Sequence, residues 1–188
     1  MPIERKTDLR ILKTRNAIKE TFKEMVCEMD ASRITIRELT DRAMIHRKTF
    51  YLHYTCIEAL YEDMLAELAG KYYEEIDQIA ADAPFTEVNR IFFTFMAAQE
   101  PYMEKIVCSV SYREFADKFF LSMLHHNRSR HNPYAKFTPE EQNIINTFLG
   151  VSSCNLYRQW IADGKKIPLD SLIELSGQLF MNGVSSIL

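Results

Sequence analysis

The stretch "ITIRELTDRAMIHRKTFYLHY", residues 34–54, decides the fold of this chain. Thr35 is followed three residues later by Glu38, which is the capping-box pattern of a helix start. That helix is short, because residues 43–45 separate it from a second helix with His46 as its N-cap. The spacing predicts two short helices joined by a tight turn, which is the helix-turn-helix arrangement.

Helical periodicity continues on both sides of this stretch. A first helix is predicted over about residues 8–29, because apolar side chains recur there at spacings of three and four: Ile18, Phe22, Met25, Val26 and Met29. A second capping box, Thr55 with Glu58, opens a long helix, and Thr138 followed by Pro139 opens another. Gly and Pro are scarce, at 5 and 6 residues, and no hairpin signal occurs. We expect an all-α chain of about nine helices.

The charge of the chain is unevenly distributed. The net charge is -3, but residues 1–54 carry +4 and residues 55–188 carry -7. A basic N-terminal third on an acidic body is the electrostatic footprint of a protein that binds nucleic acid through one part.

Several other classes of protein are disfavoured by the composition. No apolar run reaches the roughly 18 residues of a membrane span, and the charged N-terminus leads into no signal sequence, so we expect a cytoplasmic protein without membrane contact. The four cysteines form no C-x-x-C pair, and no histidine spacing matches a zinc site. No nucleophile or metal constellation is present, so we expect neither an enzyme nor a cofactor.

The second helix of the opening stretch carries many hydrogen-bond donors. In a helix-turn-helix this helix enters the major groove with its N-terminal residues nearest the base edges. Arg47 and Lys48 lie in that first turn, and arginine can pair with guanine O6 and N7 through two hydrogen bonds. Thr49, Tyr51 and His53 are suited to phosphate oxygens, which fix the register of the protein on DNA.

These residues resemble the DNA-binding domain of TetR-family transcriptional regulators. The segment "TFYLHY" is the most specific part, and "TRNAIKETFKEM" is similar to that family's first helix, so the match covers about residues 9–65. The resemblance implies a DNA-binding domain over residues 1–54, extending into the start of the next helix. Residues 55–188 would then form a helical ligand-binding and dimerisation domain.

The resemblance also implies roles for individual residues. Arg47, Lys48 and Thr49 would lie at the groove, with Arg47 as the main base contact, while Thr35, Tyr51 and His53 would contact phosphates. Three positions depart from the family pattern: Met44 replaces the usual Gly or Asn of the turn, His46 replaces a Ser or Asn cap, and Ile57 replaces a Lys. A methionine in a left-handed conformation would cost about 1 kcal/mol or more.

The C-terminal segment "FLGVSSCNLYRQWIADGKKIP" and the helix after it are similar to the family's last two helices, which pack against their mates across a dimer. The candidate dimerisation residues are Phe148, Leu156, Trp160, Leu172 and Leu179. The same apolar residues could instead form an internal core. A helix-turn-helix of this size needs two copies to recognise a palindrome, which favours the dimer.

Aromatic and methionine side chains are concentrated between Phe92 and Met123. Individually they suit a protein core, but as a group they also suit an adaptable cavity for a small apolar effector.

We therefore expect a homodimeric regulator that binds a palindromic operator in double-stranded DNA, most simply a repressor released by an effector. The alternative is a coactivator of the same fold that works through a protein partner with little direct DNA binding.

Overall fold

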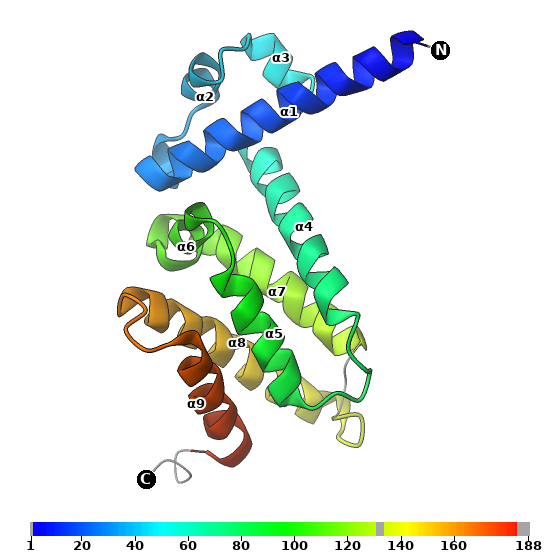
Figure 1. Ribbon diagram of the computed structural model, residues 1–188, viewed down its shortest axis with the longest axis vertical. Helices are drawn as coiled ribbons and strands as arrows, with labels where there is room; N and C mark the ends of the chain where they lie inside the picture. Colours follow the sequence, from blue (N-terminus) through cyan, green and yellow to red (C-terminus); the bar gives the residue numbers. More distant parts are fainter. Residues whose placement is uncertain (1, 131–133, 184–188) are drawn as a thin grey trace. The chain divides into compact units, whose positions relative to one another are not determined.

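The computed structural model describes residues 2–130 and 134–183, and in these residues it contains nine α-helices, two short 3-10 helices and no strand (Figure 1). The all-helical class predicted from the sequence is confirmed. The elements are α1 (Pro2–Glu28), η1 (Ala31–Arg33), α2 (Ile36–Arg42), α3 (Arg47–Tyr51), α4 (Ile57–Ile76), α5 (Phe85–Ala97), α6 (Pro101–Cys108), η2 (Val110–Tyr112), α7 (Arg113–Arg130), α8 (Pro139–Ala162) and α9 (Leu169–Asn182).

The chain forms two compact units. The first contains residues 1–67 and 101–115, and the second contains residues 68–100 and 116–188. The first unit therefore holds α1, α2, α3, the first half of α4, and α6 with η2. Helix α4 contributes residues to both units.

The first unit is organised around α1, which packs against α2 and α6. The apolar stripe predicted on α1 is confirmed, because Ile18, Phe22, Met25 and Val26 are fully buried. Phe50 of α3 is also fully buried. The sequence did not predict that α6 belongs to this unit. Helix α6 buries Tyr102, Met103, Ile106 and Val107. In η2, which follows α6, the Tyr112 hydroxyl donates a hydrogen bond of 2.7 Å to the carbonyl of Met29.

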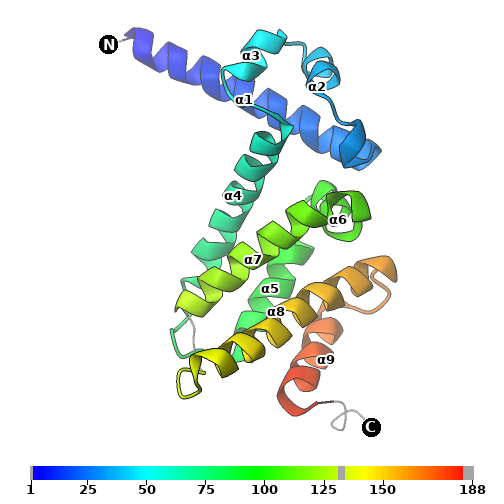
Figure 2. The same ribbon diagram turned by 180° about the vertical axis from the view of Figure 1, so that it is seen from behind.

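The second unit packs α5 against α9 and α8 against α9, as Figure 2 shows from behind. The predicted start of α8 is confirmed in detail, because Thr138 and Glu141 form a reciprocal capping box with Pro139 in the first turn. Most of the aromatic and methionine stretch lies in this unit's core, where Phe93, Met96 and Phe119 are at most 2 % exposed.

No helix in the described part of the chain is both long and apolar enough to cross a membrane.

Candidate nucleic-acid interface

Helix α2 begins where the capping pattern predicts. The Thr35 backbone is extended, and its Oγ1 accepts a hydrogen bond of 3.2 Å from the backbone N–H of Glu38. Thr35 Oγ1 only accepts in this bond. Its hydroxyl hydrogen is therefore still available to an acceptor outside the helix, such as a phosphate oxygen.

The turn between α2 and α3 is a Schellman motif with an unusual residue at its centre. The N–H of Ile45 bonds to the carbonyl of Thr40 at 3.0 Å, and the N–H of Met44 bonds to the carbonyl of Asp41 at 3.3 Å. This pattern requires a left-handed residue at position 44, and Met44 has a φ of 51°. Met44 thus takes the left-handed conformation in spite of its side chain, at a cost of roughly 1–2 kcal/mol relative to glycine.

Helix α3 begins where the sequence predicts, with His46 as N-cap and Arg47 as first residue. Its 5 residues hold Arg47 and Tyr51 one turn apart on the same side. The Arg47 Nη2 and Nε donate to the Tyr51 hydroxyl oxygen at 3.0 and 3.3 Å, and the guanidinium lies 5.6 Å from the ring centre. Tyr51 therefore orients the exposed Arg47 side chain, a role that the sequence had not suggested.

The other predicted contact residues surround this pair. Lys48 is exposed, Thr49 and His53 are half-buried, and Phe50 faces the core between them. The starts of α2 and α4 also meet at one depression in the first unit, which Thr35, Ile57 and Glu58 help to line. The exposed Glu58 carboxylate makes this depression a poor phosphate site.

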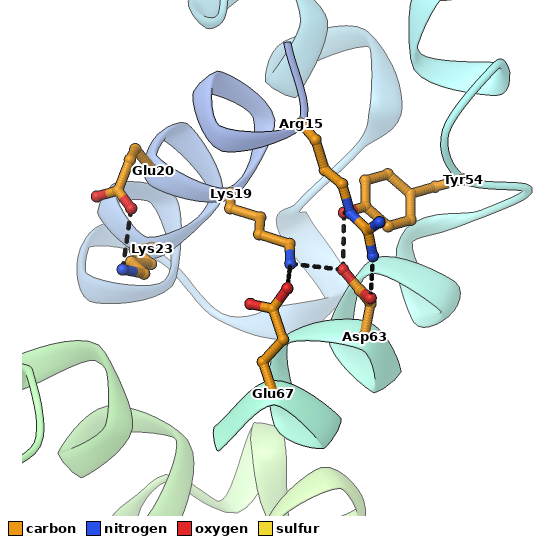
Figure 3. A network of polar contacts seen from close by, with 7 residues as sticks. All are labelled: Arg15, Lys19, Glu20, Lys23, Tyr54, Asp63 and Glu67. Carbon is orange, nitrogen blue, oxygen red and sulfur yellow. Dashed lines mark hydrogen bonds and ion pairs between the residues drawn. The ribbon is translucent and has the colours of Figure 1, made fainter. Parts of the chain in front are cut away.

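A network of polar side chains fixes α4 to α1 and to Tyr54, which follows α3 (Figure 3). The Asp63 carboxylate accepts hydrogen bonds from Arg15 and from the Tyr54 hydroxyl, the latter at 2.8 Å, and lies 2.7 Å from the Lys19 ammonium. Lys19, only 7 % exposed, also pairs with Glu67 one turn further along α4. Arg15 Nε donates to the Tyr54 hydroxyl oxygen at 3.0 Å, which closes the network.

The network changes the ionisation of its central carboxylate. Partial burial would raise the pKa of Asp63, but hydrogen bonds from Lys19, Tyr54 and Arg15 outweigh it and hold that pKa below its ordinary value. A depressed pKa in the folded state means that the charged form of Asp63 stabilises the fold above about pH 4. This contribution is lost as the pH falls through the lowered pKa.

We expect Asp63→Asn to lower the free energy of unfolding by about 2 kcal/mol at pH 7. The loss falls below the ~3–5 kcal/mol of a fully buried pair, because the Asp63 side chain is 22 % exposed and Lys19 keeps Glu67. Urea unfolding followed by circular dichroism measures the difference between variant and wild type. That difference should shrink as the pH falls from about 4 through the lowered pKa of Asp63, because the wild-type carboxylate takes up its proton over that range.

Glu20→Gln is the matched control. Glu20 also forms an ion pair on α1, with Lys23 at 3.0 Å, but the Glu20 side chain is 64 % exposed. An exposed pair of this kind contributes about 0–1 kcal/mol. Equal destabilisation by both variants, or a difference that persists in acid, would show that the Asp63 network is not a stabilising link.

Sequence reasoning missed this network because its partners are 39 and 48 residues apart. One signal was available: a tyrosine hydroxyl placed in a core, at position 54, needs a hydrogen-bond partner.

The comparisons with known proteins point to transcription regulators. No protein-family model matches the chain. An uncharacterized HTH-type transcriptional regulator of Bacillus subtilis (strain 168), YxbF, is 36 % identical over 74 residues. That match covers 39 % of this chain and 20 % of the relative, so the chain spans about a fifth of the length of its curated relative.

Two solved structures share the fold over nearly the whole chain. The transcriptional regulator FadR from Bacillus subtilis, in complex with stearoyl-CoA, matches with a TM-score of 0.68 at 12 % identity, covering 89 % of this chain and 98 % of FadR. NalD, the secondary repressor of the MexAB-OprM multidrug efflux pump in Pseudomonas aeruginosa, also matches with a TM-score of 0.68, at 17 % identity, covering 91 % of this chain and 96 % of NalD. At these identities the likeness establishes the all-helical fold.

Proposed function

We propose that this chain is a DNA-binding transcriptional regulator of the TetR type, which acts as a homodimer on a palindromic operator and is released by a small apolar effector. The observation that carries the proposal is the placement of Arg47 and Lys48. Both side chains are exposed in the first turn of α3, the second helix of a complete helix-turn-helix. The HTH-type regulator that is 36 % identical over part of the chain supports it.

The geometry of the first unit supports DNA contact. With its N-terminus in the major groove, α3 presents Arg47 and Lys48 to the base edges, and Thr49 and His53 to neighbouring phosphates. The 5 residues of α3 can contact only a few base pairs. Two copies on a symmetric operator supply the remaining specificity.

The dimer surface is proposed on α8 and α9. Of the candidate residues from the sequence, Trp160 and Leu172 are buried within their own chain, at 8 and 5 % exposed, while Leu156 and Leu179 are half-buried. Phe148 remains 56 % exposed. The proposed surface is therefore the α8–α9 apolar surface, formed by Ile144, Phe148 and Val151 at helical spacing on α8 and by Leu175 on α9.

The effector is proposed to bind in the second unit. Buried polar atoms of its core lack a hydrogen-bond partner among the described residues: Asn89 Oδ1, Asn127 Oδ1 and Asn146 Nδ2. Such atoms are costly unless water or a polar group on a largely apolar ligand satisfies them. Binding of stearoyl-CoA by the FadR of similar fold agrees with an apolar effector. Because α4 belongs to both units, an effector that favours one position of α4 would change operator affinity by population shift.

Selection of random DNA duplexes by the full chain tests this function. Wild type should enrich a palindromic motif, and its affinity should fall steeply between about 50 and 200 mM salt, because several phosphate contacts release counterions. Small apolar compounds that raise the melting temperature should weaken binding to the selected motif. Stabilising compounds that leave this affinity unchanged would rule out the effector model.

The alternative is a coactivator that contacts a protein partner instead of DNA. Its support comes from Met44, His46 and Ile57, the departures in and after the turn. The orientation of Arg47 by Tyr51 favours the DNA-binding function, since it holds a base-contacting side chain in place. Failure of the wild-type dimer to enrich any motif would make the coactivator the better account.

A further inference from the structure

The two most exposed large apolar side chains in the described part of the chain flank the recognition helix. Met44, in the turn before α3, is 91 % exposed, and Leu52, the residue that ends α3, is 82 % exposed. Every other residue of the turn and helix with an apolar side chain is covered to a greater extent. The two residues thus lie on either side of the 5 residues of α3, one before the helix and one at its end.

Met44 is unfavourable in its backbone as well as in its exposure. The end of α8 forms the same Schellman turn, with the N–H of Lys165 bonded to the carbonyl of Trp160, and there the left-handed position is Gly164 with a φ of 71°. The chain thus uses glycine at one such turn and methionine at the other. The Met44 side chain is almost fully exposed, so packing within its own chain does not offset this backbone cost.

The major groove has one apolar feature that a protein can recognise, the C5-methyl group of thymine. We propose that Met44 and Leu52 are specificity residues that contact thymine methyl groups at the two ends of the base pairs spanned by α3. This inference rests on the proposed DNA-binding function. It adds an apolar component to the contacts of Arg47, so that each half-site contains thymines in addition to the guanine that Arg47 recognises.

The expected effect follows from the size of a methyl group. Burying one methyl group contributes ~0.8 kcal/mol, which is about fourfold in affinity per half-site. Replacing thymine by uracil removes only this methyl group and leaves every hydrogen-bonding atom of the base in place. Each thymine of the selected motif is therefore replaced symmetrically by uracil, and the affinity of wild type is compared with that of the variants Leu52→Ala and Met44→Gly.

One symmetric pair of thymines is expected to contact Met44 and another to contact Leu52. Replacing either pair by uracil should lower the affinity of wild type about sixteenfold, which is fourfold for each half-site. Leu52→Ala should become insensitive to uracil at its own pair only, and Met44→Gly at the other, which is the signature of direct coupling. Val110→Ala is the matched control. Val110 is 78 % exposed in η2 of the same unit but away from α3, so this variant should respond to uracil as wild type does.

Melting temperature separates recognition from misfolding. Met44→Gly relieves the left-handed strain, so its melting temperature should equal or exceed that of wild type. Its preference for thymine over uracil at the pair assigned to Met44 should nevertheless disappear. A selected motif whose thymines tolerate uracil in wild type would overturn this inference and leave the proposed function intact. Absence of any selected motif would instead refute the proposed function itself.

Discussion

Arg47→Ala should lower operator affinity by roughly 1–3 kcal/mol per half-site and abolish the guanine preference at one symmetric pair of positions. The reason is that a guanidinium in the first turn of α3 can form two hydrogen bonds with guanine, and alanine replaces neither. Over two half-sites the loss amounts to ~2–6 kcal/mol, since separated positions contribute almost additively. Selection on random duplexes measures the change in motif, and a binding titration measures the affinity.

Two further variants separate base recognition from phosphate binding. His53→Ala removes a proposed phosphate contact, so it should weaken binding about equally on all sequences and leave the motif intact. Tyr51→Phe decides between two roles. If the Tyr51 hydroxyl acts by orienting Arg47, to which it is bonded at 3.0 Å, its removal should have no further effect in the Arg47→Ala background. A phosphate contact would instead give additive losses.

An unchanged motif for Arg47→Ala would contradict the assignment of Arg47 as a base contact. Lys48, exposed beside it, would then be the next residue to test.

Local patterns in the sequence predicted the elements of the candidate interface well. Thr35 with Glu38 places the start of α2, and the spacing from there to His46 and Arg47 places the start of α3. These features are accessible because helix caps and turns depend on residues within a few positions of each other. The conformation of the turn was not predicted, because Met44 is a residue that disfavours the left-handed region it occupies.

Contacts between distant segments could not be predicted in this way. Helix α6 has an apolar face like that of any packed helix, and nothing in its sequence shows that it packs with α1 in the first unit. Arg15 and Lys19 lie outside the apolar stripe of α1, and nothing in the sequence indicates their partners. In the structure both side chains meet Asp63 of α4, because the two helices cross there.

Apolar periodicity likewise does not distinguish a core from a dimer surface. Trp160 and Leu172 share the pattern of Phe148, yet only Phe148 remains mostly exposed. The Trp160 indole N–H donates to the carbonyl of Ile167 at 2.8 Å, which fixes that ring inside its own chain. A dimer variant has to be chosen from exposed residues, because a charge at Trp160 or Leu172 would unfold the protein instead.

Phe148→Asp should therefore convert the proposed dimer into a folded monomer. Within its own chain Phe148 packs edge-on against Phe180, with ring centres 6.0 Å apart, so its replacement has a modest cost for folding. At a two-fold interface each copy would instead bring a carboxylate into an apolar contact, and an unpaired charge there is strongly unfavourable. Sedimentation at micromolar concentration should give about twice the chain mass of 22.0 kDa for wild type and a single mass for the variant.

Leu121→Asp is the control for surface charge, since Leu121 on α7 is 55 % exposed, against 56 % for Phe148, and lies outside the α8–α9 apolar surface. It should remain dimeric and bind the operator as wild type does. Phe148→Asp should lose orders of magnitude in affinity for the full palindrome, because the second half-site no longer binds as part of the same molecule. Its affinity for an isolated half-site should match that of a wild-type subunit. A dimeric Phe148→Asp would move the interface away from α8, and a monomeric wild type would remove the physical basis for a symmetric operator.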